Sequence, residues 1–148
     1  MKNLISMLLP AKFKPRHKMT NVELQGFRHM LRLDVKTMTE LAGCAVPSWY
    51  AWESGANPVP EKIAELMDQL KADFDDCLAS YTNMAREQGN DGRVAMRYYE
   101  TFELYSSHFP KKSFLDWRIN QAVGFRLLFE EEVYLVSAEK IEAEICGK

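Results

Sequence analysis

The chain has 148 residues, of which 47% are hydrophobic, and its formal net charge is −2. This apolar fraction is enough for a real core, which excludes a disordered chain, and the length suits one compact unit or a small head with a second subdomain. The three cysteines lie far apart and are odd in number, which favours free thiols in a cytoplasmic protein over a disulfide framework.

Residues 1–18 contain five basic side chains and no acidic one. As a basic arm, this segment would follow a DNA phosphate backbone through Lys14, Arg16 and Lys18. The alternative is an upstream extension, since the pattern of the head begins only at Met19. The apolar run from Leu4 to Leu9 is too short for a secretion signal, and no other stretch approaches the roughly 20 apolar residues of a membrane span. We therefore expect no membrane partner.

Two short helices are predicted after this segment. Thr20 and Glu23 form a capping box, which predicts that the first helix begins directly after Thr20. Asp34 caps the second helix, Val35 to Ala42. Gly43 ends it, because glycine can adopt the left-handed conformation that turns a helix sharply.

A third helix is predicted from Pro47 to Ser54. Its residues Trp49, Trp52 and Glu53 share one face, which is typical of core positions. Two helices joined at a steep angle by a turn of about three or four residues form the helix-turn-helix unit, whose second helix enters the major groove of DNA. Residues 19–58 are thus predicted to form a helix-turn-helix head that extends into the helix from residue 61.

Short motifs recur at the boundaries of the predicted elements. They are Met19-Thr20-Asn21-x-Glu23-Leu24-Gln25, Leu33-Asp34-Val35, Ser48-Trp49, Trp52-Glu53-Ser54-Gly55, Val59-Pro60, Arg97-Tyr98-Tyr99 and Asp116-Trp117-Arg118. Together they resemble the YdiL-like proteins of the lambda-repressor-like superfamily, and a family of anti-CRISPR-associated autorepressors with a C-terminal dimerisation domain. The resemblance implies a mainly α fold, with a lambda-repressor-like helix-turn-helix head followed by a small α(+β) dimerisation subdomain.

By position, the resemblance also implies which side chains meet DNA. Those in the groove would be Val46, Pro47, Ser48, Tyr50 and Ala51, with Lys36 and Thr37 near a phosphate and Arg28 and Arg32 adding positive charge beside them. Arg, Gln and Asn make most bidentate contacts to base edges, and none occurs between Gly43 and Asn57. Specificity would then depend on methyl and hydroxyl contacts, half-site spacing and DNA shape.

Residues 59–148 are predicted to be a long helix and a C-terminal dimerisation subdomain. The long helix, Glu61 to Gln88, is amphipathic, and its far end would cover either a partner or its own chain. A short strand, Val94 to Tyr99, and a short helix, Phe102 to His108, follow it.

The last clear helix opens with a capping box at Ser113 and is apolar nearly all round. Because such a helix is buried on more than one side, we expect a second copy of the chain to cover it in a symmetric homodimer. The side chains expected in that interface are Trp117, Val123, Phe125, Leu128 and Phe129. After Glu130, a strand followed by a helix capped by Ser137, or a continuing helix, fit the sequence about equally.

No pattern of catalytic or metal-binding residues is evident. We therefore expect a protein that is not an enzyme and needs no cofactor or metal. The main hypothesis is a dimeric repressor that binds an inverted repeat in double-stranded DNA, with its own promoter as one candidate. The alternative is a protein-interaction module with a structural, non-DNA-binding helix-turn-helix. RNA binding is a minor alternative based on five scattered basic residues, Arg93, Arg97, Lys111, Lys112 and Arg118.

Overall fold

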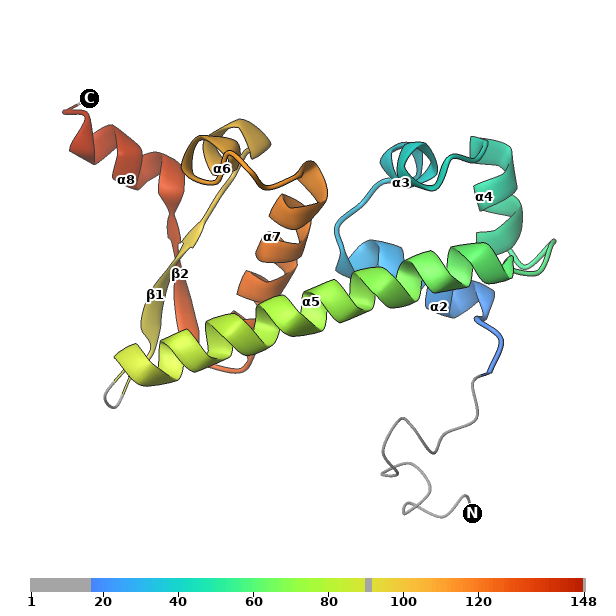
Figure 1. Ribbon diagram of the computed structural model, residues 1–148. Helices are drawn as coiled ribbons and strands as arrows, with labels where there is room; N and C mark the ends of the chain where they lie inside the picture. The colour runs from blue at the N-terminus through green and yellow to red at the C-terminus, as the bar shows by residue number, and fades with distance from the viewer. Residues whose placement is uncertain (1–16, 90–91, 148) are drawn as a thin grey trace, which may run out of the picture.

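The structure is a computed structural model that describes residues 17–89 and 92–147. Its elements are α2 Asn21–Met30, α3 Val35–Ala42, α4 Val46–Glu53, α5 Glu61–Gln88, β1 Val94–Tyr98, α6 Phe102–His108, α7 Phe114–Phe129, β2 Val133–Ser137 and α8 Ala138–Ile145. Figure 1 shows a mainly helical molecule with one small two-stranded sheet, which confirms the predicted fold class. Among the described helices, none is long and apolar enough to cross a membrane.

The long helix α5 connects the two ends of the molecule. The head helices α2 to α4 lie along its first half, and the C-terminal elements lie along its second half (Figure 1). It buries Ile63, Met67 and Leu70 toward its start and Ala85 near its end. It packs against α2 and α7 of the same chain, which cover much of its apolar face, while Met84 near its far end is 46% exposed.

One hydrophobic core runs from the head into the C-terminal region. Leu24, Met38 and Trp49 of the head are fully buried, and they belong to the same cluster as Val123 and Leu127 of α7. Burying a large apolar side chain contributes about 1.5–3 kcal/mol relative to leaving it exposed. The head and the C-terminal region therefore stabilise each other, and the division into residues 19–58 and 59–148 stays a prediction.

The two strands pair in parallel, with Val94 opposite Val133 and Tyr98 opposite Ser137. Parallel strands need a long crossover, which α6 and α7 supply. Ser137 ends β2 and also caps α8, since its side chain accepts a hydrogen bond from the Lys140 N–H. The C-terminal end of the chain is therefore a strand followed by a helix, the first of the two arrangements considered from the sequence.

Helix α7 is covered by its own chain. It contacts α5, α6 and both strands. Val123 is 0% exposed, and Trp117 is buried with its indole N–H donating to the Tyr99 carbonyl oxygen at 2.8 Å. The prediction that Trp117 and Val123 lie in a dimer interface is therefore corrected, because the small sheet and α5 cover the sides of α7 that the sequence left for a partner.

Candidate nucleic-acid interface

Side-chain caps fix the first two helices of the head. The Thr20 hydroxyl accepts from the Glu23 N–H at 3.2 Å, and the Glu23 carboxylate accepts from the Thr20 N–H at 3.0 Å. Asp34 accepts from the Thr37 N–H at 2.7 Å. Gly43 follows α3 with a φ of 67°, the left-handed conformation expected of it. The predicted starts of α2 and α3 and the predicted end of α3 are confirmed.

Helix α4 follows the turn and presents one face to the head and the other to solvent. It begins at Val46, one residue earlier than predicted, so Pro47 occupies its second position. Trp49 is fully buried and meets the half-buried Trp52 ring edge to face, with centroids 5.8 Å apart. On the opposite face Tyr50 is 56% exposed. The outer face of α4 is therefore not occluded by residues 17–89 or 92–147.

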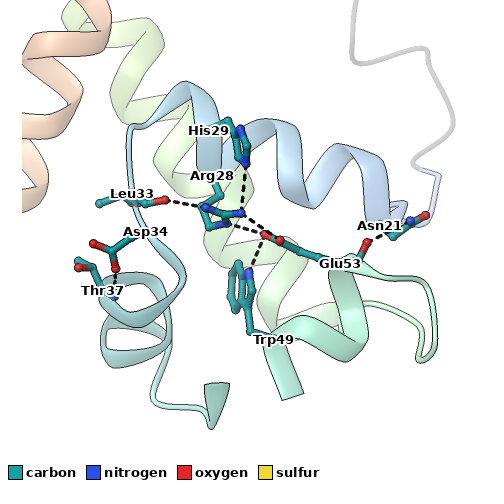
Figure 2. Close-up of polar contacts among 8 residues, drawn as sticks. All are labelled: Asn21, Arg28, His29, Leu33, Asp34, Thr37, Trp49 and Glu53. Carbon is teal, nitrogen blue, oxygen red and sulfur yellow. Dashed lines mark hydrogen bonds and ion pairs between the residues drawn. The ribbon is translucent and has the colours of Figure 1, made fainter. Parts of the chain in front are cut away.

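A buried ion pair fastens α4 to α2 (Figure 2). Arg28 donates from Nε and Nη2 to the two carboxylate oxygens of Glu53, at 2.6 and 3.0 Å. Its Nη1 donates to the Leu33 carbonyl oxygen at 3.0 Å, and the Trp49 indole N–H donates to Glu53 at 2.8 Å. The side chains of Arg28 and Glu53 are only 12% and 7% exposed. This Arg28–Glu53–Trp49 network fixes the angle at which α4 is presented.

The ionised form of Glu53 is favoured inside this network. Burial by itself raises the pKa of a carboxyl group, but the hydrogen bonds from Arg28 and Trp49 and the charge of Arg28 outweigh it. The pKa of Glu53 is therefore below its usual value of 4.5. The pair stays charged at neutral pH.

Arg28 lies away from the position predicted for it. The sequence analysis expects it beside Arg32 as positive charge near DNA, whereas its guanidinium points into the head and contacts Glu53, Leu33 and His29. The predicted role of Arg28 as a DNA contact is corrected, because these contacts use its donors within the head. The missed signal was Glu53 itself, because a carboxylate on the same face as Trp49 needs a buried cation.

The other predicted groove and phosphate residues of α3 and α4 are at least partly exposed. Their exposure falls into two classes: Lys36, Val46, Pro47 and Tyr50 are exposed, and Thr37, Ser48 and Ala51 are half-buried. In the arm, Lys18 is exposed, and Lys14 and Arg16 lie outside the described residues. Contact of these side chains with DNA stays a prediction.

Comparison with known proteins identifies the family. A model of the Aca2/YdiL-like family matches residues 19–135, from the start of the head into β2. The chain belongs to the Aca2/YdiL-like family. This confirms the resemblance drawn from the sequence motifs.

Two curated relatives support the membership in the Aca2/YdiL-like family. The chain is 30% identical over 107 residues to the "Aca2 repressor" of Pectobacterium phage ZF40, covering 72% of this chain and 90% of that protein. It is 24% identical over 111 residues to the "Uncharacterized protein YdiL" of Escherichia coli (strain K12), covering 74% and 92%. Both alignments therefore span nearly the whole length of the relative.

A second exposed surface lies at the C-terminal end of α7, within the residues that match the Aca2/YdiL-like family. Phe129 is 89% exposed and Leu128 37%, while Phe125 is half-buried. Phe125 and Phe129 line a groove of about 470 Å³ together with Met30 of α2, which is 56% exposed. The charged side chains that line the same groove are Arg32, Arg126 and Glu130. We call Met30, Phe125, Leu128 and Phe129 the apolar patch. Exposed apolar side chains that gather in this way are typical of interaction sites.

Arg32 lines the same groove as Met30, Phe125 and Phe129 of the apolar patch. It occupies the loop from α2 to α3 with a φ of 56°, and its guanidinium carbon is 4.9 Å from the centre of the Phe125 ring. Its charge is therefore placed beside α7 as well as beside the start of α3.

Nothing in the described residues forms a metal-binding group of three or more His, Cys, Asp or Glu side chains. Cys44, Cys77 and Cys146 are free thiols. Burial raises the pKa of Cys44, and it raises the pKa of Cys77 to about 11. Both thiols are thus protonated at neutral pH, which makes them poor nucleophiles.

Proposed function

We propose that this protein is a transcriptional repressor that acts in the cytoplasm and binds an inverted-repeat operator in double-stranded DNA as a homodimer. The observation that carries the proposal is the exposed outer face of α4, held at a fixed angle by the Arg28–Glu53–Trp49 network. The name of the phage relative, a repressor, supports a regulatory role. The promoter of the protein's own gene is the first operator to test.

The groove-facing side chains would read DNA by shape and by weak contacts. Val46 and Ala51 offer methyl groups to thymine, and Ser48 and Tyr50 offer hydroxyls to base edges or phosphates. Each such contact discriminates less than the roughly 1–3 kcal/mol of a bidentate pair. Lys36 at the start of α3 would add a phosphate contact.

Dimerisation would raise this modest specificity, because two copies of α4 would bind the same operator. The apolar patch is the surface we assign to the partner copy, because Met30 and Phe129 are large, apolar and exposed at one groove. A two-fold dimer that binds an inverted repeat must place its two copies of α4 on half-sites about one helical turn, or a multiple of it, apart.

The protein-interaction alternative has one observation in its favour. Leu41 of α3 and Val46 and Tyr50 of α4 are all exposed, and no arginine lies on α4. A protein partner would bind such a surface by burying it. Duplex binding that depends on α4 distinguishes the two functions.

The test is a gel shift with the DNA upstream of the protein's own gene and the double variant Ser48→Glu, Tyr50→Glu. Negative charge on the groove-facing side of α4 should reduce binding at least tenfold, a loss of about 1.4 kcal/mol or more. The matched control is Ser80→Glu, Tyr134→Glu, which adds the same charges at exposed positions of α5 and β2. Equal binding by the two double variants would remove α4 from the interface.

A further inference from the structure

The side chain of Arg118 is held in one orientation near the start of α7. Its guanidinium carbon lies 4.2 Å from the centre of the Trp117 ring and 5.4 Å from that of Phe114. Its Nη1 donates to the Gln121 side-chain oxygen at 2.9 Å. Its Nε is buried and has no hydrogen-bond partner among the described residues. A guanidinium fixed in this way is pre-organised, so little rotamer freedom remains to be lost when it binds an anion.

A continuous set of contacts connects Arg118 to Arg32 of the head. Gln121, which accepts from Arg118, donates from Nε2 to the Tyr98 hydroxyl at 3.2 Å. The Tyr98 ring packs on Phe125 with centroids 5.3 Å apart, and Arg32 lies over the other ring of that pair, Phe125. The two guanidinium groups are thus positioned by one cluster that bridges the head and the C-terminal region.

Neither arginine is neutralised within the described stretches of the chain. The ion pairs found there involve Arg28, Arg86, Arg93 and Arg126, and not Arg32 or Arg118. Burial and then the charge of Arg32 lower the pKa of Arg118, which shows that the two cations act on each other. Tyr98 and then Asp34 raise the pKa of Arg118 in part, and the Asp34 carboxylate already accepts from the Thr37 N–H.

These charges lie beside the start of α3. The charge of Asp34, the N-cap of α3, raises the pKa of Arg118, and Arg32 stands two residues before Asp34 in the chain. In a helix-turn-helix the first helix, here α3, crosses the phosphate backbone, and arginines and helix N-termini supply most backbone contacts.

We propose that Arg118 and Arg32 form a phosphate-binding site, through which the C-terminal region of the chain contacts the backbone of double-stranded DNA next to α3. The inference rests on the proposed DNA binding and extends the contact surface beyond the head. Because a phosphate contact carries no base information, the site contributes affinity equally on every sequence.

The test is the salt dependence of DNA binding by the full chain. Fluorescence anisotropy would follow two labelled duplexes, the region upstream of the protein's own gene and a shuffled duplex of the same composition. The variants are Arg118→Gln and Arg32→Gln, and Arg86→Gln is the matched control, since Arg86 pairs with Glu132 near the far end of α5. Each cluster variant should flatten the slope of log affinity against log salt by about 0.9 and weaken both duplexes by the same factor.

The melting temperature of each variant distinguishes a folding defect from the loss of a DNA contact. Arg32 is exposed, so Arg32→Gln tests the site even if Arg118→Gln lowers the melting temperature. If the wild type binds DNA and both variants show the same salt slope as Arg86→Gln, the phosphate site is wrong and the proposed DNA binding still stands. If the wild type binds neither duplex, both the proposed function and the phosphate site are wrong. Weaker binding of single-stranded RNA with an unchanged duplex slope would assign the arginines to RNA and overturn the inference.

Discussion

The carboxylate of Glu53 receives three hydrogen bonds from two side chains, two from Arg28 and one from Trp49. Its backbone carbonyl also accepts from Asn21 at 3.2 Å, so one residue ties α4 to both ends of α2 (Figure 2). A buried charge pair is sensitive to loss of one partner, because the other is left charged and unpaired. The presentation of α4 therefore depends on the ionised form of Glu53.

We predict that Glu53→Gln destabilises the protein by about 3 kcal/mol at neutral pH, the lower end for breaking a buried pair. Because folding lowers the pKa of Glu53, the ionised carboxylate contributes its full stabilisation above pH 4.5. This stabilisation is lost as the pH falls through the pKa of the folded state. Urea unfolding should therefore show the difference between wild type and variant shrinking below pH 4.5. Asp75→Asn, which breaks an exposed pair with Lys71, is the control and should cost under about 1 kcal/mol. A constant difference at every pH would contradict the assigned charge state.

At the scale of elements, the turn between α3 and α4 determines where the outer face of α4 points. Gly43 makes this turn possible, since its φ of 67° is strained for a residue with a Cβ. Its N–H donates to the Thr39 carbonyl oxygen and so closes α3. Gly26, in contrast, lies inside α2, where a Cβ would meet nothing within 4 Å.

The two glycines give opposite predictions for the same substitution. Gly43→Ala should cost about 1–2 kcal/mol and lower the melting temperature by several degrees. Gly26→Ala should gain about 0.5–1 kcal/mol, because alanine favours the helix and the site has room. Differential scanning calorimetry of both variants measures the shifts. A stabilising Gly43→Ala would be inconsistent with the left-handed turn.

Much of this local structure could be predicted from the sequence, because helix caps act over three or four residues. The capping boxes at Thr20 and Ser113 and the cap at Asp34 predict the starts of α2, α7 and α3. The Arg28–Glu53 pair joins residues 25 positions apart, and no local pattern identifies such a partner.

The C-terminal region shows the same limit. The parallel pairing of β1 with β2 connects residues on either side of α6 and α7, so it was not foreseen. Without the sheet, α7 lacked a cover inside its own chain, and the predicted dimer interface extended to residues that are buried. Of the candidate site, the exposure of Tyr50 on α4 followed from helical spacing, whereas the inward direction of Arg28 did not.

At the scale of the whole molecule, the continuous core joins the head and the C-terminal region into a single unit. The apolar patch and the outer face of α4 are then held at a fixed separation within each chain. In a two-fold dimer this separation sets the distance between half-sites, which is how a surface without arginine on α4 could select one DNA spacing.

We predict that Phe129→Asp shifts the protein toward monomers by weakening self-association at least tenfold, since it places a charge where apolar surfaces would meet. The control is Val22→Asp, which alters a side chain that is 69% exposed on α2, outside the apolar patch. Light scattering coupled to size exclusion measures the mass over a range of concentrations. A wild-type mass of one chain at every concentration would contradict the dimer.

Hydroxyl-radical footprinting of the DNA upstream of the protein's own gene would show whether a dimer presents the outer face of α4 to a duplex. We expect two protected patches of backbone about 10 base pairs apart, or a multiple of that spacing, both lost in Ser48→Glu, Tyr50→Glu and both retained in Ser80→Glu, Tyr134→Glu. No protection by the wild type, or protection that survives the change on α4, would contradict this expectation.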